Sequence, residues 1–314
     1  MLVGTIGRTL KKLNRNKTFL LMVLPGAVYF LLFSYLPMPG AIIAFKEYRF
    51  DRDGFLASIW RSKWTGFKNF EFLFQSEDAY IIVRNTLLYN FAFIVLGTVL
   101  SVIMAVILHE IVSRRWAKIY QTGMFLPYFL SWVIVSYFLF SFLSVDRGVL
   151  NQALTALGME RVSWYAEPAY WPYILVLVNL WKGVGYSSVV YLAAIIGIDK
   201  SYYEAAMIDG AGKWQQIWSI TLPFIRPMII ILTVLAIGGI FRADFGLFYQ
   251  VPRNTGALFP VTNVIDTYVY RGLKVTGNIG MSTAAGLYQS VVGLVLVMVT
   301  NAVVKRINKE NALF

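Results

Sequence analysis

The sequence predicts an all-α integral membrane protein with six transmembrane helices in one domain. Of its 314 residues, 58% are hydrophobic and 14% are charged, whereas about 25% of the residues in an ordinary soluble domain are charged. Six apolar stretches approach the ~20 residues that a helix needs to cross a hydrocarbon core of about 30 Å. These stretches are residues 18–45, 84–108, 119–143, 171–196, 223–241 and 281–304.

The first apolar stretch is interpreted as a retained span. It follows the basic segment RTLKKLNRNK, which could begin a secretion signal. The apolar run after it is longer than the about 7–15 residues of a signal-peptide core and has no A-x-A cleavage site. We therefore expect residues 18–45 to stay in the protein as its first span.

The distribution of basic residues predicts that both termini lie in the cytoplasm. In this orientation fourteen Lys and Arg residues lie inside and twelve outside, but the inner segments are shorter and the outer basic residues lie among acids. The net charge of +12 is then read as basic flanks facing anionic lipid, not as a nucleic-acid surface. The predicted parts are a cytoplasmic N-terminus (1–17), a six-span domain (18–304), a cytoplasmic tail (305–314), and outer loops at 46–83, 144–170 and 242–280.

Composition argues against several kinds of active site. The chain has no cysteine and a single histidine, His109, so thiolate zinc sites, cysteine nucleophiles and histidine-based triads are not expected, and no metal site is predicted. An ion-coupled carrier needs titratable groups near the midplane, and a membrane-embedded enzyme needs a buried acid-base cluster. No Asp or Glu lies in the middle of a predicted span, so both remain as weaker alternatives.

The predicted loop between spans four and five, residues 199–223, is expected in the cytoplasm and to contain a short helix. Ser201 and Glu204 have the S-x-x-E spacing of a capping box, which starts a helix by satisfying its first amide donors. Gly210 is expected to end this helix by turning through φ > 0. The residues alone also allow an ordinary interfacial linker here.

The same segment resembles the EAA loop of binding-protein-dependent ABC importer permeases. One departure from that family is Asp199, where many relatives have proline. The flanking segments WKGVGYSSVVYLAAI and FYQVPRNTGALFPVTNVIDTYVYRGL resemble the permeases that handle complex oligosaccharides and polysaccharide fragments. The residues that fall on the EAA motif are Glu204, Ala205, Ala206, Asp209, Gly210, Ala211, Ile220, Leu222 and Pro223.

This resemblance implies a six-span permease whose 199–223 loop forms a coupling helix on a cytoplasmic ATPase. It also implies four kinds of partner: two copies of that ATPase, a second and non-identical permease, an extracellular solute-binding protein, and an oligosaccharide substrate in a bacterial cell membrane. ATP and Mg are expected on the ATPase, and no cofactor on this chain. Gly212-Lys213 is no P-loop, because Met207 and Trp214 stand where the motif needs Gly and Ser or Thr.

Polar and aromatic residues near spans four to six are the candidate substrate path. An intramembrane lysine, Lys182, is costly and suggests a cavity, although it could instead pair with an acid or a carbonyl in the bundle. An oligosaccharide suits aromatic and hydrogen-bonding groups, and Lys182 favours an acidic one; a peptide fits the same groups. Packing or interfacial anchoring are the alternative roles on spans five and six. The candidates are Trp181, Lys182, Tyr186, Ser187, Arg242, Asp244, Tyr288 and Gln289.

Overall fold

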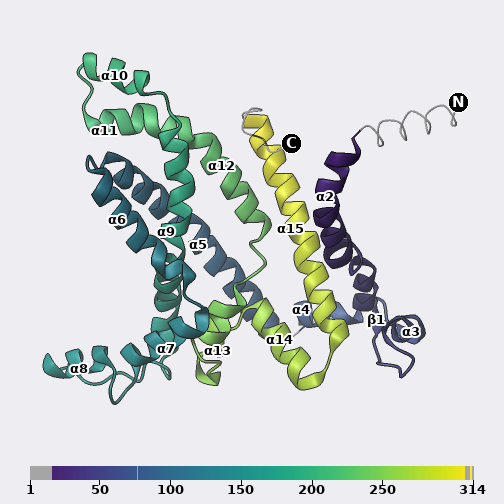
Figure 1. Cartoon of the computed structure of the whole chain (residues 1–314). Helices are drawn as coiled ribbons and strands as arrows, with labels where there is room; N and C mark the ends of the chain where they lie inside the picture. The colour runs from purple at the N-terminus through teal and green to yellow at the C-terminus, as the bar shows by residue number, and fades with distance from the viewer. Residues whose placement is uncertain (1–15, 76, 308–311, 313–314) are drawn as a thin grey trace, which may run out of the picture. The chain divides into compact units, whose positions relative to one another are not determined.

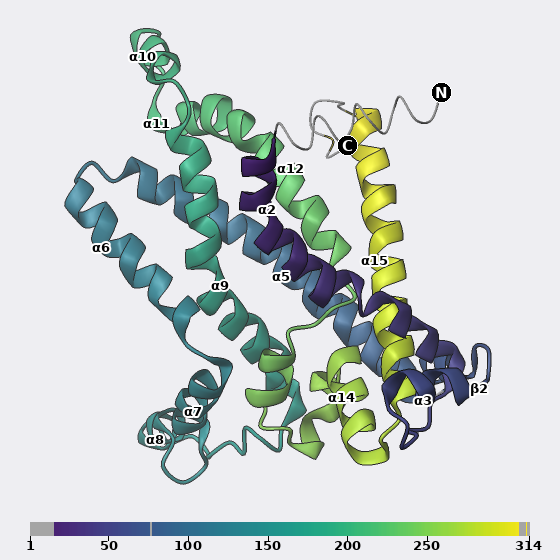
Figure 2. The same cartoon turned by 45° about the vertical axis from the view of Figure 1, so that its right-hand side comes forward.

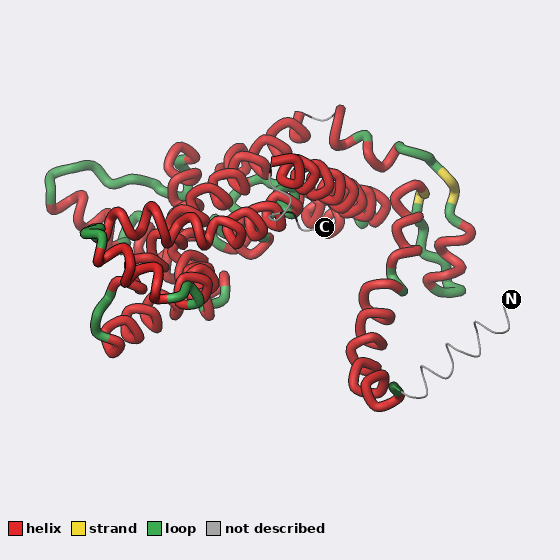
Figure 3. The backbone as a smooth tube through the Cα atoms, turned by 90° about the horizontal axis from the view of Figure 1, so that it is seen from above, coloured by secondary structure: helices red, strands yellow, loops and turns green. Residues whose placement is uncertain are grey.

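A computed structural model describes residues 16–75, 77–307 and 312 of the chain, which divide into two compact units (Figure 1). The first unit comprises the described residues up to Phe70 together with Asn278–Leu287. The second comprises Glu71–Gly277 and the described residues from Tyr288 onward. Figure 3 shows helices joined by loops in the described part of the second unit, and the two short strands belong to the first.

The first unit begins with a continuous helical run, Lys17–Phe45, that is long and apolar enough to cross a membrane. A two-stranded antiparallel sheet follows it, with Lys46 paired to Trp64. The Asn69 side-chain amide donates to the carbonyls of Ala44 (3.0 Å) and Lys46 (2.8 Å), which fixes the end of the run to the sheet. The elements are α2 (Lys17–Phe30), η1 (Leu31–Tyr35), η2 (Met38–Phe45), β1 (Lys46–Glu47), α3 (Phe55–Arg61), β2 (Lys63–Trp64) and η3 (Lys68–Phe70).

The second unit is built around helix α9 (Trp171–Ile196), which lies along α5 (Glu77–Glu110) and between α6 (Arg114–Phe125) and α12 (Leu222–Gly238) (Figures 1 and 2). Helices α10 and α11 lie at one end of this unit, and α7, α8, α13 and α14 lie at the other. The remaining elements are α4 (Phe72–Gln75), η4 (Leu126–Phe129), α7 (Trp132–Leu143), α8 (Val149–Ala156), η5 (Pro168–Tyr170), α10 (Lys200–Ile208), α11 (Lys213–Gln216), η6 (Ile217–Thr221), η7 (Gly246–Gln250), η8 (Gly256–Leu258), α13 (Phe259–Thr262), α14 (Ile265–Thr276) and α15 (Ile279–Ile307), the last of which begins in the first unit.

Helix α9 has one buried face because its apolar residues recur every three or four positions. Toward the α7 end, Trp171, Leu175 and Val178 belong to a buried cluster with Leu247 and Phe248. Toward the α10 end, a second cluster contains Tyr191 and Ile195 from α9, with Val102 and Ala105 from α5 and Ile225 from α12. The first cluster thus joins α9 to the segment that follows α12, and the second holds α5, α9 and α12 together.

The predicted spans correspond to helical runs in the structure, with differences at the third and the fifth. Within the described residues, five helices are long and apolar enough to cross a membrane, and a bent pair brings the number to as many as six. The third predicted span, residues 119–143, is a bent pair of helices, because Arg114–Phe129 and Trp132–Leu143 meet at 98°. Pro127 lies in the 3-10 turn at this break, and Ser131 caps the new helix by accepting from the Ile134 amide.

The fifth span is longer than expected, since its helical run covers Lys213–Gly238 instead of beginning at residue 223. The predicted outer loops also contain short helices. Two asparagines on α5 hold neighbouring backbone to the bundle: Asn85 donates to the carbonyls of Pro260 and Asn263 at α13, and Asn90 donates to those of Ile240 and Arg242 just after α12. Each amide thereby satisfies irregular backbone that would otherwise be left without a partner.

Candidate functional site

The 199–223 segment forms two short helices, α10 and α11, joined by a tight turn. The expected capping box is wrong in its details, because Asp199 caps α10 and Ser201 lies inside the helix. The Asp199 carboxylate accepts from the Ser201 amide at 2.9 Å, and this hydrogen bond lowers the pKa of Asp199. The departure from proline at this position therefore supplies an N-cap.

Gly210 makes the turn that ends α10. Its φ is +79°, as the sequence predicted, and a Cβ at this position would meet nothing within 4 Å. The Ala211 amide donates back to the Ala206 carbonyl at 2.8 Å, closing the helix end. Gly210 is therefore required by backbone conformation and not by crowding within the chain.

The α10–α11 segment presents a largely unburied surface, with Glu204, Ala205, Asp209 and Gly210 all exposed. Ile208 is 87% exposed and Trp214 is 75% exposed. Among the described residues, the Glu204 side chain has no hydrogen bond or ion pair. Large apolar side chains beside exposed carboxylates at a helix end are typical of a protein interaction surface.

Two side-chain contacts attach this segment to the rest of the unit. The Lys213 ammonium pairs with the Glu110 carboxylate at the end of α5, at 2.8 Å. The Tyr203 hydroxyl lies 3.0 Å from the Thr221 hydroxyl. Thr221 is buried and ends the π-helical segment η6, after which Leu222 and Pro223 open α12. Helix α11 is thus joined to the end of α5, and α10 to the segment that leads into α12.

Lys182 lies at the centre of an aromatic cluster where the third span breaks. Its ammonium donates to the Tyr128 carbonyl at 2.6 Å and lies 5.2 Å from the ring centroids of both Tyr128 and Trp132. Tyr186, one turn further along α9, stacks on Tyr128 with centroids 4.2 Å apart. The lysine therefore has the carbonyl partner that the sequence left open, together with two aromatic faces.

Asp244 joins the same cluster from the segment after α12. Its carboxylate accepts from the Trp132 indole at 2.8 Å and from the Leu247 amide at 3.2 Å. Lys182, Tyr186 and Asp244, which the sequence singled out separately, are thus gathered around Tyr128 and Trp132. We call these five residues the Lys182 cluster.

The candidates near span six form a different network, which packs elements together. Gln289 is buried and its amide donates to the Phe241 carbonyl (2.7 Å) and to the Asp266 carboxylate (3.1 Å). Asp266 also accepts from the Ala243 amide, and burial raises its pKa. Arg242 donates to the Ser290 hydroxyl, and the Tyr288 ring packs against Phe74 and Phe241. These contacts pack the segment after α12 against α14 and α15.

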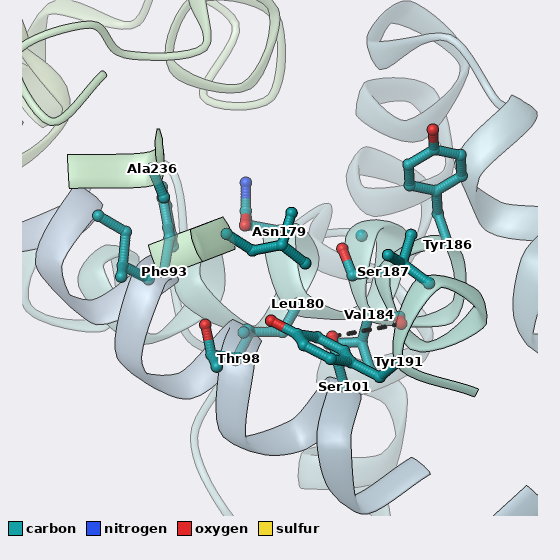
Figure 4. A pocket seen from close by; sticks show the side chains of 15 residues that line it. Phe93, Thr98, Ser101, Asn179, Leu180, Val184, Tyr186, Ser187, Tyr191 and Ala236 are labelled. Atoms are coloured by element: carbon teal, nitrogen blue, oxygen red, sulfur yellow. Dashed lines mark hydrogen bonds between the residues drawn. The ribbon is translucent and has the colours of Figure 1, made fainter. Parts of the chain in front are cut away.

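Tyr186 and Ser187 line a pocket of about 350 Å³ between α5, α9 and α12 (Figure 4). Its polar lining comes from Thr98 and Ser101 on α5 and from Asn179 and Tyr191 on α9. Trp181 lies elsewhere: it lines a mostly apolar pocket of about 520 Å³ with residues of α5 and α6. The eight candidates are therefore distributed over the Lys182 cluster, two pockets and the Gln289 network.

Glycines shape the contact between α6 and α9. Helix α9 runs unbroken through Gly183 and Gly185, so these residues do not bend it. A Cβ at Gly185 would clash with the Met124 carbonyl, so Gly185 allows the backbone of α6 to pack directly on α9.

Comparison with known proteins identifies the family of this chain. Residues 97–309 match the family described as the binding-protein-dependent transport system inner membrane component. The chain belongs to this family. It is therefore the membrane component of a transport system and not an enzyme, and the resemblance and the membrane fold predicted from its sequence are confirmed.

Two Bacillus subtilis (strain 168) proteins are similar to this permease over nearly its whole length. Protein LplB is 36% identical over 298 residues, which cover 95% of this chain and 92% of LplB. The polygalacturonan/rhamnogalacturonan transport system permease protein YteP is 37% identical over 304 residues, covering 96% and 92%.

A solved bacterial ABC transporter involved in the import of the acidic polysaccharide alginate contains a similar chain. The TM-score is 0.84 at 35% identity, with 96% of this permease and 99% of that chain covered. A second structure, of the bacterial alginate ABC transporter in complex with alginate pentasaccharide-bound periplasmic protein, gives the same TM-score and identity, with 95% and 98% covered.

Sequence reasoning missed several residues that organise the permease. Tyr128 and Trp132 lie in the apolar stretch 119–143 and were not singled out, although Pro127 and Ser131 signal a break there. Asp266 was one acid in a long loop, and nothing local showed that it would be buried. Asn179, Thr98 and Ser101 are polar residues in apolar stretches, and helical spacing could have placed Asn179 on the face that Ser187 shares.

Proposed function

We propose that this permease moves carboxylate-bearing oligosaccharides, such as fragments of acidic polysaccharides, into the cell. The observation that supports this is the Lys182 cluster, which combines one ammonium group with the rings of Tyr128, Trp132 and Tyr186 at the break of the third span. Aromatic rings suit the apolar faces of sugars, and an ammonium group makes a stronger hydrogen bond to an anionic ligand than to a neutral one.

Two relatives support the same class of substrate. YteP is named for polygalacturonan and rhamnogalacturonan, and the similar solved chain belongs to an importer of alginate, an acidic polysaccharide. In the free permease Lys182 is occupied by the Tyr128 carbonyl. A sugar carboxylate would replace that neutral acceptor with a charged one, which makes a stronger hydrogen bond.

The energy source is proposed to be ATP hydrolysis on a separate subunit. The exposed α10–α11 surface would dock on a cytoplasmic ATPase, and the contacts of Lys213 and Tyr203 would pass its movement to α5 and α12. Two ATPase copies with ATP and Mg, a second and non-identical permease, and an extracellular solute-binding protein would complete the transporter. This chain itself would bind no cofactor, metal or nucleic acid.

The proposed location is a bacterial cell membrane, with both termini in the cytoplasm. The α10–α11 end of the second unit would then face the cytoplasm, and α7, α8, α13 and α14 would face outward (Figure 1). A cysteine scan is well suited to test this, because the chain has no native cysteine. Single cysteines at Ile208 and Arg147 should react with a membrane-impermeant reagent from opposite sides.

The substrate class is tested by Lys182→Met in the reconstituted transporter. Methionine keeps the length of the side chain and removes the charge, so uptake of uronic-acid oligomers should fall at least about tenfold while uptake of neutral oligomers of equal length is retained. Lys63→Met, an exposed lysine of the first unit, is the matched control. Equal uptake of both oligomers by Lys182→Met would remove the charge argument. A transporter that responds to peptides or amino acids and to no oligosaccharide would overturn the sugar assignment.

A further inference from the structure

A strained turn follows η7 at the end of the second unit that carries α7. Arg253 and Asn254 have φ values of +56° and +49°, and among the described residues they are the only non-glycine residues with positive φ. The Arg253 amide donates to the Gln250 carbonyl and the Asn254 amide to the Tyr249 carbonyl, both at 3.0 Å. Asparagine tolerates this conformation, but arginine adopts it rarely, and such strain is concentrated at binding and catalytic sites.

The strained backbone places the Arg253 side chain over aromatic rings of α7. Its guanidinium carbon lies 4.2 Å from the centroid of Phe140 and 5.7 Å from that of Tyr137. Arg253 is exposed and forms no ion pair within the part of the chain that the structure describes. One face of the guanidinium is thus covered by the rings, while its charge has no carboxylate partner.

Arg253 lines a pocket of about 370 Å³, which we call the Arg253 pocket. No Asp or Glu contributes to its lining. Tyr249 is held in place by stacking on Phe245 at 4.8 Å and by an edge contact with Tyr270 at 5.2 Å. The lining residues are Val133, Ser136, Tyr137, Tyr249, Gln250, Arg253 and Asn254.

The remaining polar groups of the pocket favour a ligand rich in acceptors. The Asn254 carbonyl oxygen already accepts from Arg271 at 2.9 Å, so its amide NH₂ is the free end. The Ser136 hydroxyl is committed to the Gln250 carbonyl at 2.6 Å. Arginine binds carboxylates with paired N–H groups, and the exposed ring of Tyr137 provides a flat surface for a sugar.

We propose that the Arg253 pocket is a second saccharide site, which binds one carboxylate-bearing sugar unit apart from the Lys182 cluster. Its ligand class rests on the proposed function. The two sites share α7, since Trp132 belongs to the Lys182 cluster and Tyr137 to the Arg253 pocket. An oligomer entering from the α7 end of the permease would meet the Arg253 pocket at that end of the unit.

The test measures direct binding of a uronic-acid trisaccharide to the complete transporter in lipid nanodiscs, without solute-binding protein, by titration calorimetry. A neutral trisaccharide is the matched ligand. Arg253→Gln should weaken binding of the acidic trimer about tenfold or more and leave the neutral one unchanged, because it removes a charge-assisted contact. Arg253→Lys should restore part of the loss. Arg147→Gln, at another exposed arginine, should change neither.

A second variant keeps the proposal testable if Arg253→Gln does not fold. Tyr137 is 63% exposed and its substitution strains no backbone. Tyr137→Leu should weaken the binding of acidic and neutral trimers alike, because it removes the sugar-facing ring.

Three outcomes would overturn the proposal. Affinity of Arg253→Gln for the acidic trimer within twofold of wild type would show that the guanidinium contacts no sugar. Unchanged sugar binding together with weaker stimulation of ATP hydrolysis by the solute-binding protein would make the pocket a protein-docking site. Normal binding of the acidic trimer by Arg253→Gln, together with reduced binding by Lys182→Met, would refute the second site and leave the proposed function intact. If the wild-type transporter bound neither trimer, with or without solute-binding protein, the sugar assignment itself would be refuted.

Discussion

Asp266 illustrates how a single half-buried residue can set the pH dependence of a permease of this kind. Burial raises its pKa, while the Ala243 amide and the Gln289 side chain both donate to one of its carboxylate oxygens. The carboxyl of Asp266 therefore keeps its proton to a higher pH in the folded protein than in the unfolded chain, where the pKa of Asp is about 3.9. Stability is lost as the pH rises through the folded-state pKa.

Asp266→Asn should therefore stabilise the detergent-solubilised permease at pH 8. Asparagine keeps an oxygen for both donors and removes the buried charge, so we expect a gain of about 1 kcal/mol, or a melting temperature higher by about 2–4 °C. The gain should shrink toward zero as the pH falls below about 3, where the wild-type carboxyl is protonated in both states. A gain that is constant between pH 4 and 8 would contradict this account.

At the scale of elements, the turn between α10 and α11 makes a sharp prediction. Gly210→Ala forces a Cβ into a left-handed conformation at a cost of about 1–2 kcal/mol, so α10 should end differently. We expect fewer sugar molecules imported per ATP hydrolysed, with the effect largest for Gly210→Trp. Gly212→Ala is the matched control, because Gly212 has φ of −71° and equally open surroundings.

If both glycine variants reduced transport equally, the effect would come from the partner surface and not from the turn. Wild-type coupling in Gly210→Trp would show that the α10–α11 segment has no role in coupling.

The hydroxyl contact between α10 and η6 makes a second prediction. Tyr203→Phe leaves the buried Thr221 hydroxyl without its partner, at a cost of about 1 kcal/mol, and loosens α10 from α12. Hydrolysis of ATP should continue while uptake per ATP falls. Tyr202→Phe, at an exposed neighbour, should keep the wild-type ratio. Equal ratios in the two variants would rule out this contact as a transmission point.

The elements that sequence could predict are those with local causes. Span lengths follow from hydropathy, and the turn at Gly210 follows from a helix-ending glycine. The Lys182 cluster could not be predicted, because 54 residues separate Lys182 from Tyr128 and 112 separate Trp132 from Asp244. Hydropathy likewise does not reveal the break near Pro127, because the helices on both sides of the bend are apolar and together have the hydropathy of a single span. The capping error at Ser201 arose because Asp199 offers a competing cap two residues earlier.

At the scale of the whole molecule, much of the apolar surface of the second unit's helices is left exposed. Only 22% of the most apolar window is buried in each of α5 and α9, and 17% in the span that contains α12. Lipid can cover part of this surface, but a permease with one α10–α11 segment offers one docking site for a motor that we propose to contain two ATPases. A second membrane subunit should therefore share the surface.

Mild-detergent purification of the native complex should recover this permease with one non-identical permease and two ATPase copies. Native mass spectrometry gives the stoichiometry directly. Omission of the second permease from expression should lower the recovery of ATPase with this chain. A stable homodimer that transports sugar without any ATPase would refute the proposed assembly.

The break in the third span explains, in terms of helix dipoles, why two charged residues lie where they do. The end of the α6–η4 arm carries partial negative charge from its free carbonyls, and the Lys182 ammonium binds one of them, that of Tyr128. The start of α7 carries partial positive charge, and the Asp244 carboxylate is held against Trp132, its first residue. Each formal charge thus offsets the partial charge at one of the two helix ends that the break creates. A homologous chain with a straight third span would have no such ends, and we expect it to lack both charges.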